Sequence, residues 1–112
     1  MYVCNAFSLN MLPVGFTSEL HELVVGPVSE VVARELLANV DGGWTSAIGH
    51  KDTAAVVSGL LGQEIKENRL NVKLSDSRDS LLVAQYNGPR LPEGSTTLPA
   101  GAEIQFYWIY VL

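Results

Sequence analysis

The chain has 112 residues, of which 47% are apolar and 17% are charged, and this composition predicts one globular domain with a sizeable core. Seven Lys and Arg residues stand against twelve Asp and Glu residues, and the formal net charge of −5 argues against a broad, nonspecific grip on long DNA or RNA. No stretch approaches the roughly 20 apolar residues that span a bilayer, and the N-terminus lacks the features of a secretory signal, so we expect a cytoplasmic protein without a membrane partner.

The first predicted element is a strand over residues 2–7, which are rich in strand-forming side chains. Cys4 is the only cysteine of the sequence and lies in this apolar strand. An intrachain disulfide and a cysteine-rich zinc site are therefore excluded, and we predict a buried, unreactive thiol. Residues 8–13 mix polar and apolar side chains and end in proline, which predicts a loop or a short helical turn.

A second strand and a first helix follow along the chain. Residues 19–25 are strand-prone, and the Gly-Pro pair at residues 26–27 is expected to stop that strand. His21 stands between acidic residues in this strand, and we predict that it is exposed and inert. The three-and-four spacing of apolar residues predicts an amphipathic helix over residues 28–37, and the Asp-Gly-Gly sequence at residues 41–43 ends this unit.

A second helix is predicted after residue 49. Apolar side chains at positions 54, 57, 60 and 61 share one helical face, and Gly62 suits the C-terminal stop. His50 therefore lies at the entry of this helix.

Strand signals dominate the C-terminal half. Residues 69–74 alternate apolar and polar side chains, and the polar turn at residues 75–79 leads into a strand over residues 81–86, so we expect a hairpin. Residues 87–102 hold three prolines and three glycines, which predicts a long irregular loop of the kind that is functional or disordered. Residues 103–112 are strongly aromatic and β-branched and predict a final core strand.

The order of these elements predicts the fold class. Strands mixed with two helices indicate an α/β sandwich, a single domain over residues 1–112 with a mixed sheet of about five strands flanked by helices. In the final strand, one phase is expected to face the core and contains Ile104, Phe106, Trp108 and Tyr110.

His50 is the first candidate for chemistry. The first four backbone N–H groups of a helix have no partners within it, so a helix N-terminus attracts phosphate. A histidine beside that terminus can transfer protons near neutral pH. Asp52 and His50 alone make a poor metal pair, so we expect no metal and no cofactor. A small phosphate ligand held by one or two arginines remains compatible with the acidic composition.

Four sequence blocks occur in the order of a known family. They are Asn5-Ala6-Phe7-Ser8-Leu9-Asn10-Met11-Leu12, Ile48-Gly49-His50, Asn68-Arg69 and Arg90-Leu91-Pro92-Glu93-Gly94. Together they resemble the ring nucleases that archaeal viruses and bacteriophages encode as type III anti-CRISPR proteins, which have relatives in bacterial CRISPR loci. The resemblance implies a metal-independent homodimeric enzyme that destroys cyclic tetra-adenylate, the second messenger of type III CRISPR systems, in the host cytoplasm if the protein is viral.

The resemblance also implies roles for individual residues. His50 matches the catalytic histidine, Glu93 its supporting acidic residue and Arg90 the arginine that binds the ligand. Positions that match the substrate-binding pocket are Asn5, Ser8, Asn10, Arg69 and Gln85. Plain structural roles stay open, because the N-terminal side chains also suit turn caps, and the arginines and the glutamine also suit a solvated surface.

The expected chemistry needs no enzyme nucleophile. A ribose 2′-hydroxyl of the ring attacks the adjacent phosphorus, His50 protonates the leaving 5′-oxygen, and Arg90 stabilises the phosphorane charge. Glu93 either orients His50, raises its pKa or fixes Arg90. Because the ring and a homodimer share a two-fold axis, two linear di-adenylates are expected. The alternatives are a non-catalytic sponge that binds a cyclic nucleotide, and a viral regulatory protein that acts by protein contacts.

Overall fold

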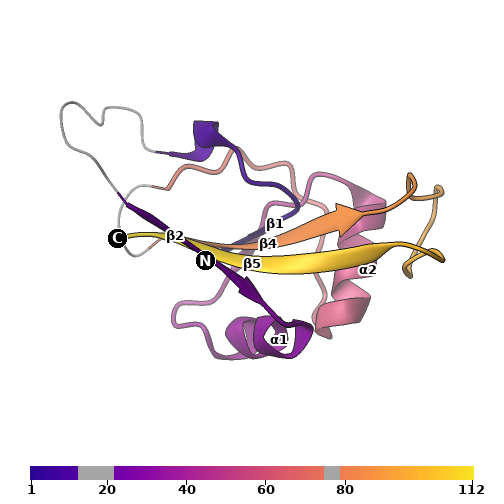
Figure 1. Cartoon of the computed structure of the whole chain (residues 1–112), viewed down its shortest axis with the longest axis horizontal. Coiled ribbons are helices and arrows are strands. Elements are labelled where there is room, and N and C mark those ends of the chain that lie inside the picture. Colours follow the sequence, from indigo (N-terminus) through magenta and orange to yellow (C-terminus); the bar gives the residue numbers. More distant parts are fainter. Residues whose placement is uncertain (13–21, 75–78) are drawn as a thin grey trace.

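The computed structural model describes residues 1–12, 22–74 and 79–112, and it shows a five-stranded mixed sheet with two α-helices (Figure 1). In chain order the elements are β1 (Tyr2–Cys4), the 3₁₀-helix η1 (Leu9–Met11), β2 (Leu23–Val28), α1 (Glu30–Asn39), β3 (Thr45–Ser46), α2 (Lys51–Leu61), β4 (Ser80–Asn87) and β5 (Glu103–Val111). The strand order is β2-β5-β4-β1-β3. Strand β1 is parallel to β3 and β4, whereas β5 is antiparallel to β2 and β4. The predicted α/β class and the mixed sheet are confirmed.

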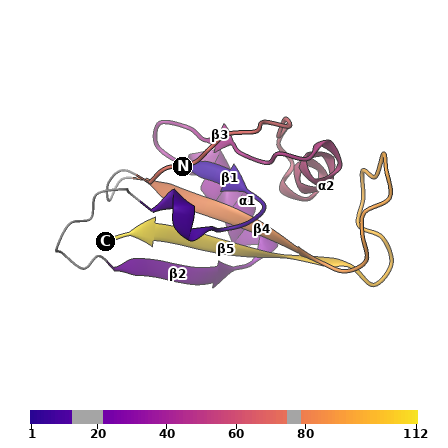
Figure 2. The same ribbon diagram turned by 90° about the horizontal axis from the view of Figure 1, so that it is seen from above.

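Strands β4 and β5 form the long central hairpin of the sheet. Their register runs from Ser80 opposite Tyr110 to Asn87 opposite Glu103. Figure 2 shows the two strands running side by side to the loop that joins them. That loop, residues 88–102, contains no helix or strand, as its prolines and glycines predict.

Each helix has recognisable end signals. The side chain of Ser29 caps α1 by accepting a hydrogen bond from Val32 N at 3.1 Å, so this helix begins two residues later than predicted. Gly62 ends α2 in the left-handed conformation with φ of 68°, and its N–H donates to the Ser58 carbonyl at 2.9 Å. The predicted second helix and its glycine stop are confirmed. None of the described helices is long and apolar enough to cross a membrane.

Both faces of the sheet are covered by apolar side chains. One face packs against both helices in a buried cluster that comprises Val3, Ala33, Leu37, Ile48, Ala54, Val57, Leu61, Ile65, Leu82, Ala84 and Phe106. The other face carries a second cluster made of Cys4, Val72, Leu74, Leu81, Val83, Ile109 and Val111. In Figure 2, η1 lies in front of the sheet and α1 behind it. The predicted core phase of β5 is therefore only part of its contribution to the core, because Ile109 and Val111 of the opposite phase are buried as well.

Two predicted strand boundaries are wrong. Strand β1 ends at Cys4, three residues earlier than predicted. Strand β2 does not stop at Gly26 and Pro27 but runs through them to Val28. Because β2 is an edge strand, only one of its sides needs backbone donors, and a proline without an N–H is tolerated there. The first residues of the predicted strand, including His21, lie outside the described residues.

The predicted strand over residues 69–74 and its hairpin with β4 are also wrong. This segment is irregular, although Val72 and Leu74 are buried on the second face of the sheet. Leu74 N donates to the Met11 carbonyl at 2.7 Å, while β4 pairs with β1 and β5 instead. The alternating pattern therefore reflects a segment lying across the sheet, not a strand within it. Of the predicted turn, residues 75–78 lie outside the described residues.

Cys4 is 2% exposed and belongs to the second apolar cluster. Burial raises the pKa of its thiol to about 11, against a smaller lowering effect of a backbone hydrogen bond from Ala6. The thiol is therefore protonated at neutral pH and is a poor nucleophile. The predicted buried thiol is confirmed.

Candidate functional site

His50 is the N-cap residue of α2. Its backbone is extended, and its carbonyl accepts the first helical hydrogen bond from Ala54 N at 3.0 Å. Its side chain makes no capping hydrogen bond and is exposed. The imidazole is therefore free to meet a ligand at the N-terminus of the helix, where unpaired N–H groups favour an anion.

A short set of hydrogen bonds fixes the segment that carries His50. Ser46 Oγ donates to the Lys66 carbonyl at 2.6 Å, and Asn68 donates through its backbone to the Ile48 carbonyl at 2.8 Å. Asn68 Nδ2 also donates to the Ser46 carbonyl at 2.7 Å, while Ile48 is fully buried. Hydrogen bonds with residues 66–68 and the burial of the Ile48 side chain thus fix the segment directly before His50.

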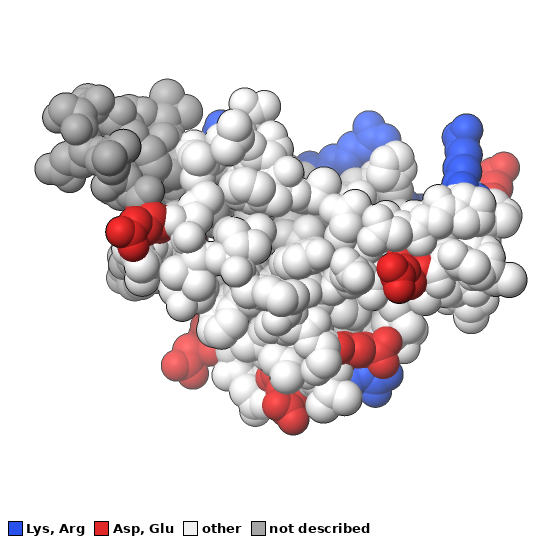
Figure 3. Space-filling view, viewed as in Figure 1, with Lys and Arg blue, Asp and Glu red and all other residues white. Residues whose placement is uncertain are grey.

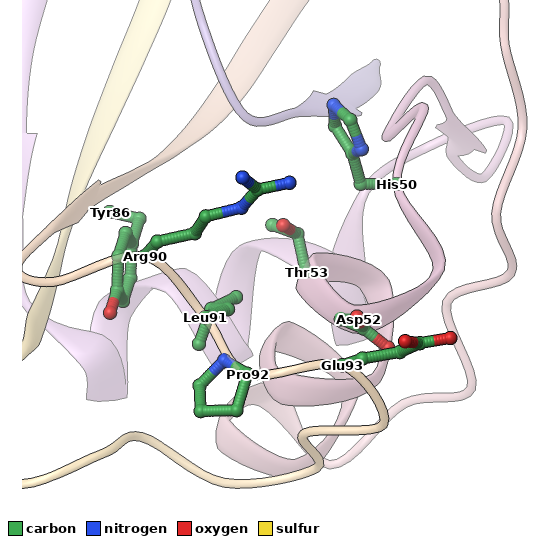
Figure 4. A pocket seen from close by; sticks show the side chains of 8 residues that line it. All are labelled: His50, Asp52, Thr53, Tyr86, Arg90, Leu91, Pro92 and Glu93. Carbon is green, nitrogen blue, oxygen red and sulfur yellow. The ribbon is translucent and has the colours of Figure 1, made fainter.

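A first cavity of about 680 Å³ opens beside His50. Its lining comes from the start of α2, the end of β4 and the following loop, and comprises His50, Asp52, Thr53, Tyr86, Arg90, Leu91, Pro92 and Glu93 (Figure 4). Figure 4 shows the Arg90 side chain extending toward His50 and Thr53, whereas Glu93 lies beside Asp52. Glu93 forms no hydrogen bond or ion pair with His50 or Arg90 within the described parts of the chain, although all three line one cavity.

A second cavity of about 530 Å³ also has His50 in its lining. It is lined by Asn5, Ala47, Gly49, His50, Arg69, Leu70 and Asn71. Arg69 Nε donates to the Gly49 carbonyl at 3.3 Å, so the guanidinium is tied to the residue that precedes His50. His50 therefore lines both cavities, and each lining contains one arginine.

Comparison with known proteins places the chain in a family. The sequence profile described as STIV B116-like matches residues 1–107. The chain belongs to the STIV B116-like family. Its fold is similar to B116 of Sulfolobus turreted icosahedral virus, with a TM-score of 0.73, 29% sequence identity and coverage of 97% of both chains. Among curated proteins, none matches the sequence.

Three predicted residues of this STIV B116-like protein do not line either cavity. Ser8 caps η1 by accepting from Asn10 N at 3.3 Å, and the Asn10 carbonyl accepts a hydrogen bond from Lys73 Nζ. Gln85 is exposed on β4, and its Nε2 donates to the Tyr86 carbonyl at 3.4 Å. The turn-capping role that the sequence left open is what the structure shows for Ser8.

Sequence reasoning missed several residues that line the two cavities, among them Asp52, Thr53 and Tyr86. Thr53 lies one helical turn after His50, and this spacing alone would have placed both side chains on one face. Tyr86 ends up in the cavity because the long hairpin loop starts beside it, and no local sequence signal gives that path. Among the described residues, no group of three or more His, Cys, Asp or Glu side chains is placed to hold a metal ion.

The charges of this family member are unevenly distributed. In Figure 3, Lys and Arg side chains stand mainly along the upper edge of the molecule, with an acidic side chain beside them at the right end. Asp and Glu side chains are spread over this face, and several of them lie in the lower part, around α1 as seen in Figure 1. A chain with a net charge of −5 can therefore still offer a locally cationic approach to a small anion.

The loop of residues 88–102 closes tightly at its base. Gly88 has φ of +150°, and a Cβ placed there would lie 2.7 Å from Ala102 Cβ and 2.9 Å from Ala102 Cα. Close to this point, the Tyr86 hydroxyl donates to the Pro89 carbonyl. The absence of a side chain at Gly88 thus allows the two ends of the loop, at Gly88 and Ala102, to lie against each other shortly before Arg90.

The Gly88→Ala variant is expected to lower the free energy of unfolding by about 1–3 kcal/mol, because a side chain requires both an unfavourable φ and a shift of the opposing backbone. Urea denaturation measures this loss. Gly26→Ala is the matched control, since a Cβ at Gly26 meets nothing within 4 Å and its φ is ordinary. Equal stabilities of the two variants would contradict the role given to Gly88.

Proposed function

We propose that this STIV B116-like protein is a metal-independent ring nuclease that cleaves cyclic tetra-adenylate to linear di-adenylate and so switches off type III CRISPR signalling. The observation that carries the proposal is the position of His50. Its exposed imidazole makes no capping hydrogen bond and lines two open cavities at the N-terminus of α2, and each cavity offers a guanidinium. A cyclic ligand that carries several phosphates has negative charges to match both guanidinium groups.

The two cavities suit an anionic ring. Arg90 projects into the first cavity, and Arg69 lines the second beside the backbone of Gly49. Guanidinium groups bind phosphate oxygens through paired, charge-assisted hydrogen bonds. Asn5 adds an amide to the second cavity. We infer that Arg69 and Asn5 hold the ring while Arg90 meets the phosphate that reacts.

The proposed reaction uses the substrate's own nucleophile. A ribose 2′-oxygen forms a bond to the adjacent phosphorus and loses its proton to water, while the bond from phosphorus to the 5′-oxygen breaks. The His50 imidazolium donates its proton to that 5′-oxygen, and water later restores the proton. The product ends in a 2′,3′-cyclic phosphate and a free 5′-hydroxyl. Alignment of the three atoms in the site removes an entropic cost worth several kcal/mol, with about 7–11 kcal/mol as the upper range.

A homodimer completes the proposed site. A cyclic tetranucleotide has a two-fold axis, and two copies of the chain related by the same axis would present two His50 side chains to opposite phosphates. Cleavage at both phosphates divides the ring into two equal halves. The expected product is therefore di-adenylate and not a linear tetramer.

The test is incubation of the purified protein with cyclic tetra-adenylate in the presence of EDTA, followed by chromatography of the products. We expect linear di-adenylate that carries a cyclic phosphate. Intact ring that stays bound to the protein would replace the nuclease with a cyclic-nucleotide sponge. Intact ring without binding would favour a protein that acts by contacts with other proteins. Cleavage that EDTA abolishes would contradict the metal-independent mechanism.

A further inference from the structure

Asp52 links two of the segments that line the first cavity, helix α2 and the loop of residues 88–102. It lies in the first turn of α2, two residues after His50, and its Oδ1 accepts a hydrogen bond from Gly94 N at 3.2 Å. Gly94 directly follows Glu93 in the loop that also carries Arg90. The carboxylate therefore joins the helix that presents the imidazole to the loop that presents the arginine (Figure 4).

This contact stands out because the loop has few ties to the rest of the chain. Within the described residues, it is the one hydrogen bond that connects residues 88–102 to α2. At the other end of the Arg90 segment, the Tyr86 hydroxyl holds the Pro89 carbonyl. The four residues from Arg90 to Glu93 thus lie between two fixed points. Pro89 is held by a side chain of β4, and Gly94 is held by a side chain of α2.

We propose that Asp52 is a positioning residue of the ring nuclease: its bond to the Gly94 amide sets the Arg90 side chain opposite His50. This inference rests on the proposed function for its kinetic consequences. In this role Asp52 does not need to touch the reacting phosphate, because it acts through the loop that its Oδ1 holds. Misplacement of a catalytic group by about 1 Å can cost about 10²-fold in rate, so a single loop contact can matter.

If Asp52 only stabilised helix α2, its effect would come from its charge and not from its contact with Gly94. An acidic residue in the first turn of a helix interacts favourably with the helix dipole, and this interaction needs the negative charge. The contact with Gly94 needs only an acceptor oxygen. Asp52→Asn keeps an acceptor of similar shape and removes the charge, whereas Asp52→Ala removes both. The two variants therefore separate loop positioning from helix stabilisation.

The first measurement does not depend on any activity. Amide hydrogen exchange of Gly94, followed by NMR, is expected to be protected in the wild type and in Asp52→Asn and to become faster in Asp52→Ala. Lys51→Ala, an exposed neighbour in the same helical turn, is the control and is expected to leave this exchange unchanged. Equal exchange in the wild type and Asp52→Ala would overturn the proposed contact.

The second measurement is the cleavage rate under saturating substrate. We expect Asp52→Ala to lower kcat by about 10- to 100-fold and Asp52→Asn to stay within about threefold of the wild type. In an Arg90→Ala background, Asp52→Ala should add little further loss, because the group it positions is already gone. Losses that multiply in the double variant, or a kcat that follows charge instead of the acceptor, would overturn the inference. If the wild type does not cleave, the proposed function fails while the exchange experiment still tests the contact.

Discussion

The His50→Ala variant is expected to cleave cyclic tetra-adenylate about 10²- to 10⁴-fold more slowly than the wild type, because it lacks the group that protonates the leaving 5′-oxygen. Binding of the ring should be largely kept, since Arg69 and Arg90 line the cavities independently of the imidazole. Single-turnover cleavage with excess enzyme measures the chemical step, and calorimetry measures the binding.

The matched control is His21→Ala, which removes the other histidine of the sequence. This variant should cleave at the wild-type rate. An unchanged rate in His50→Ala would reject the assigned proton donor. A parallel loss of binding and cleavage would instead make His50 a ligand contact without a specific role in the reaction.

The Leu82→Ala variant is expected to lose about 2–5 kcal/mol of unfolding free energy, through lost apolar burial and the cavity left behind. Leu82 is fully buried in β4, a central strand of the sheet, and belongs to the cluster that both helices cover. Urea denaturation with a two-state fit measures the change.

Leu9→Ala makes the same chemical change at a side chain that is 74% exposed. Its stability should stay within about 0.5 kcal/mol of the wild type. Comparable losses in both variants would show that the cluster around Leu82 is not the stabilising core of the fold.

The helices and the long strands could be predicted because their signals are local. The stop of α2 at Gly62 needs only a residue that accepts positive φ, and the aromatic and β-branched run of β5 favours a strand in any context. The two-residue strand β3 was missed because its residues, Thr45 and Ser46, are too few and too polar to form a pattern. Residues 69–74 were assigned wrongly because alternate burial arises equally when an irregular segment lies on a sheet.

The residues of the candidate site likewise divide into those that the sequence indicates and those that depend on the whole fold. The resemblance brought His50, Arg90 and Glu93 together, and the structure places all three around one cavity. The loop path that adds Tyr86 depends on how β4 and β5 pair, which is a property of the whole sheet. Of the three pocket residues predicted in the N-terminal block, Asn5, Ser8 and Asn10, only Asn5 lines a cavity beside His50.

The two margins of the sheet have a consequence for solubility. On one side, β2 carries Pro27, which has no amide hydrogen to offer to an incoming strand. On the other side, β3 is only two residues long. Short or proline-bearing margins are a common natural defence against fibrillar association, since a foreign strand finds no long ladder of free donors to extend. Within the part of the chain that the structure describes, both margins therefore give an incoming strand little backbone to pair with.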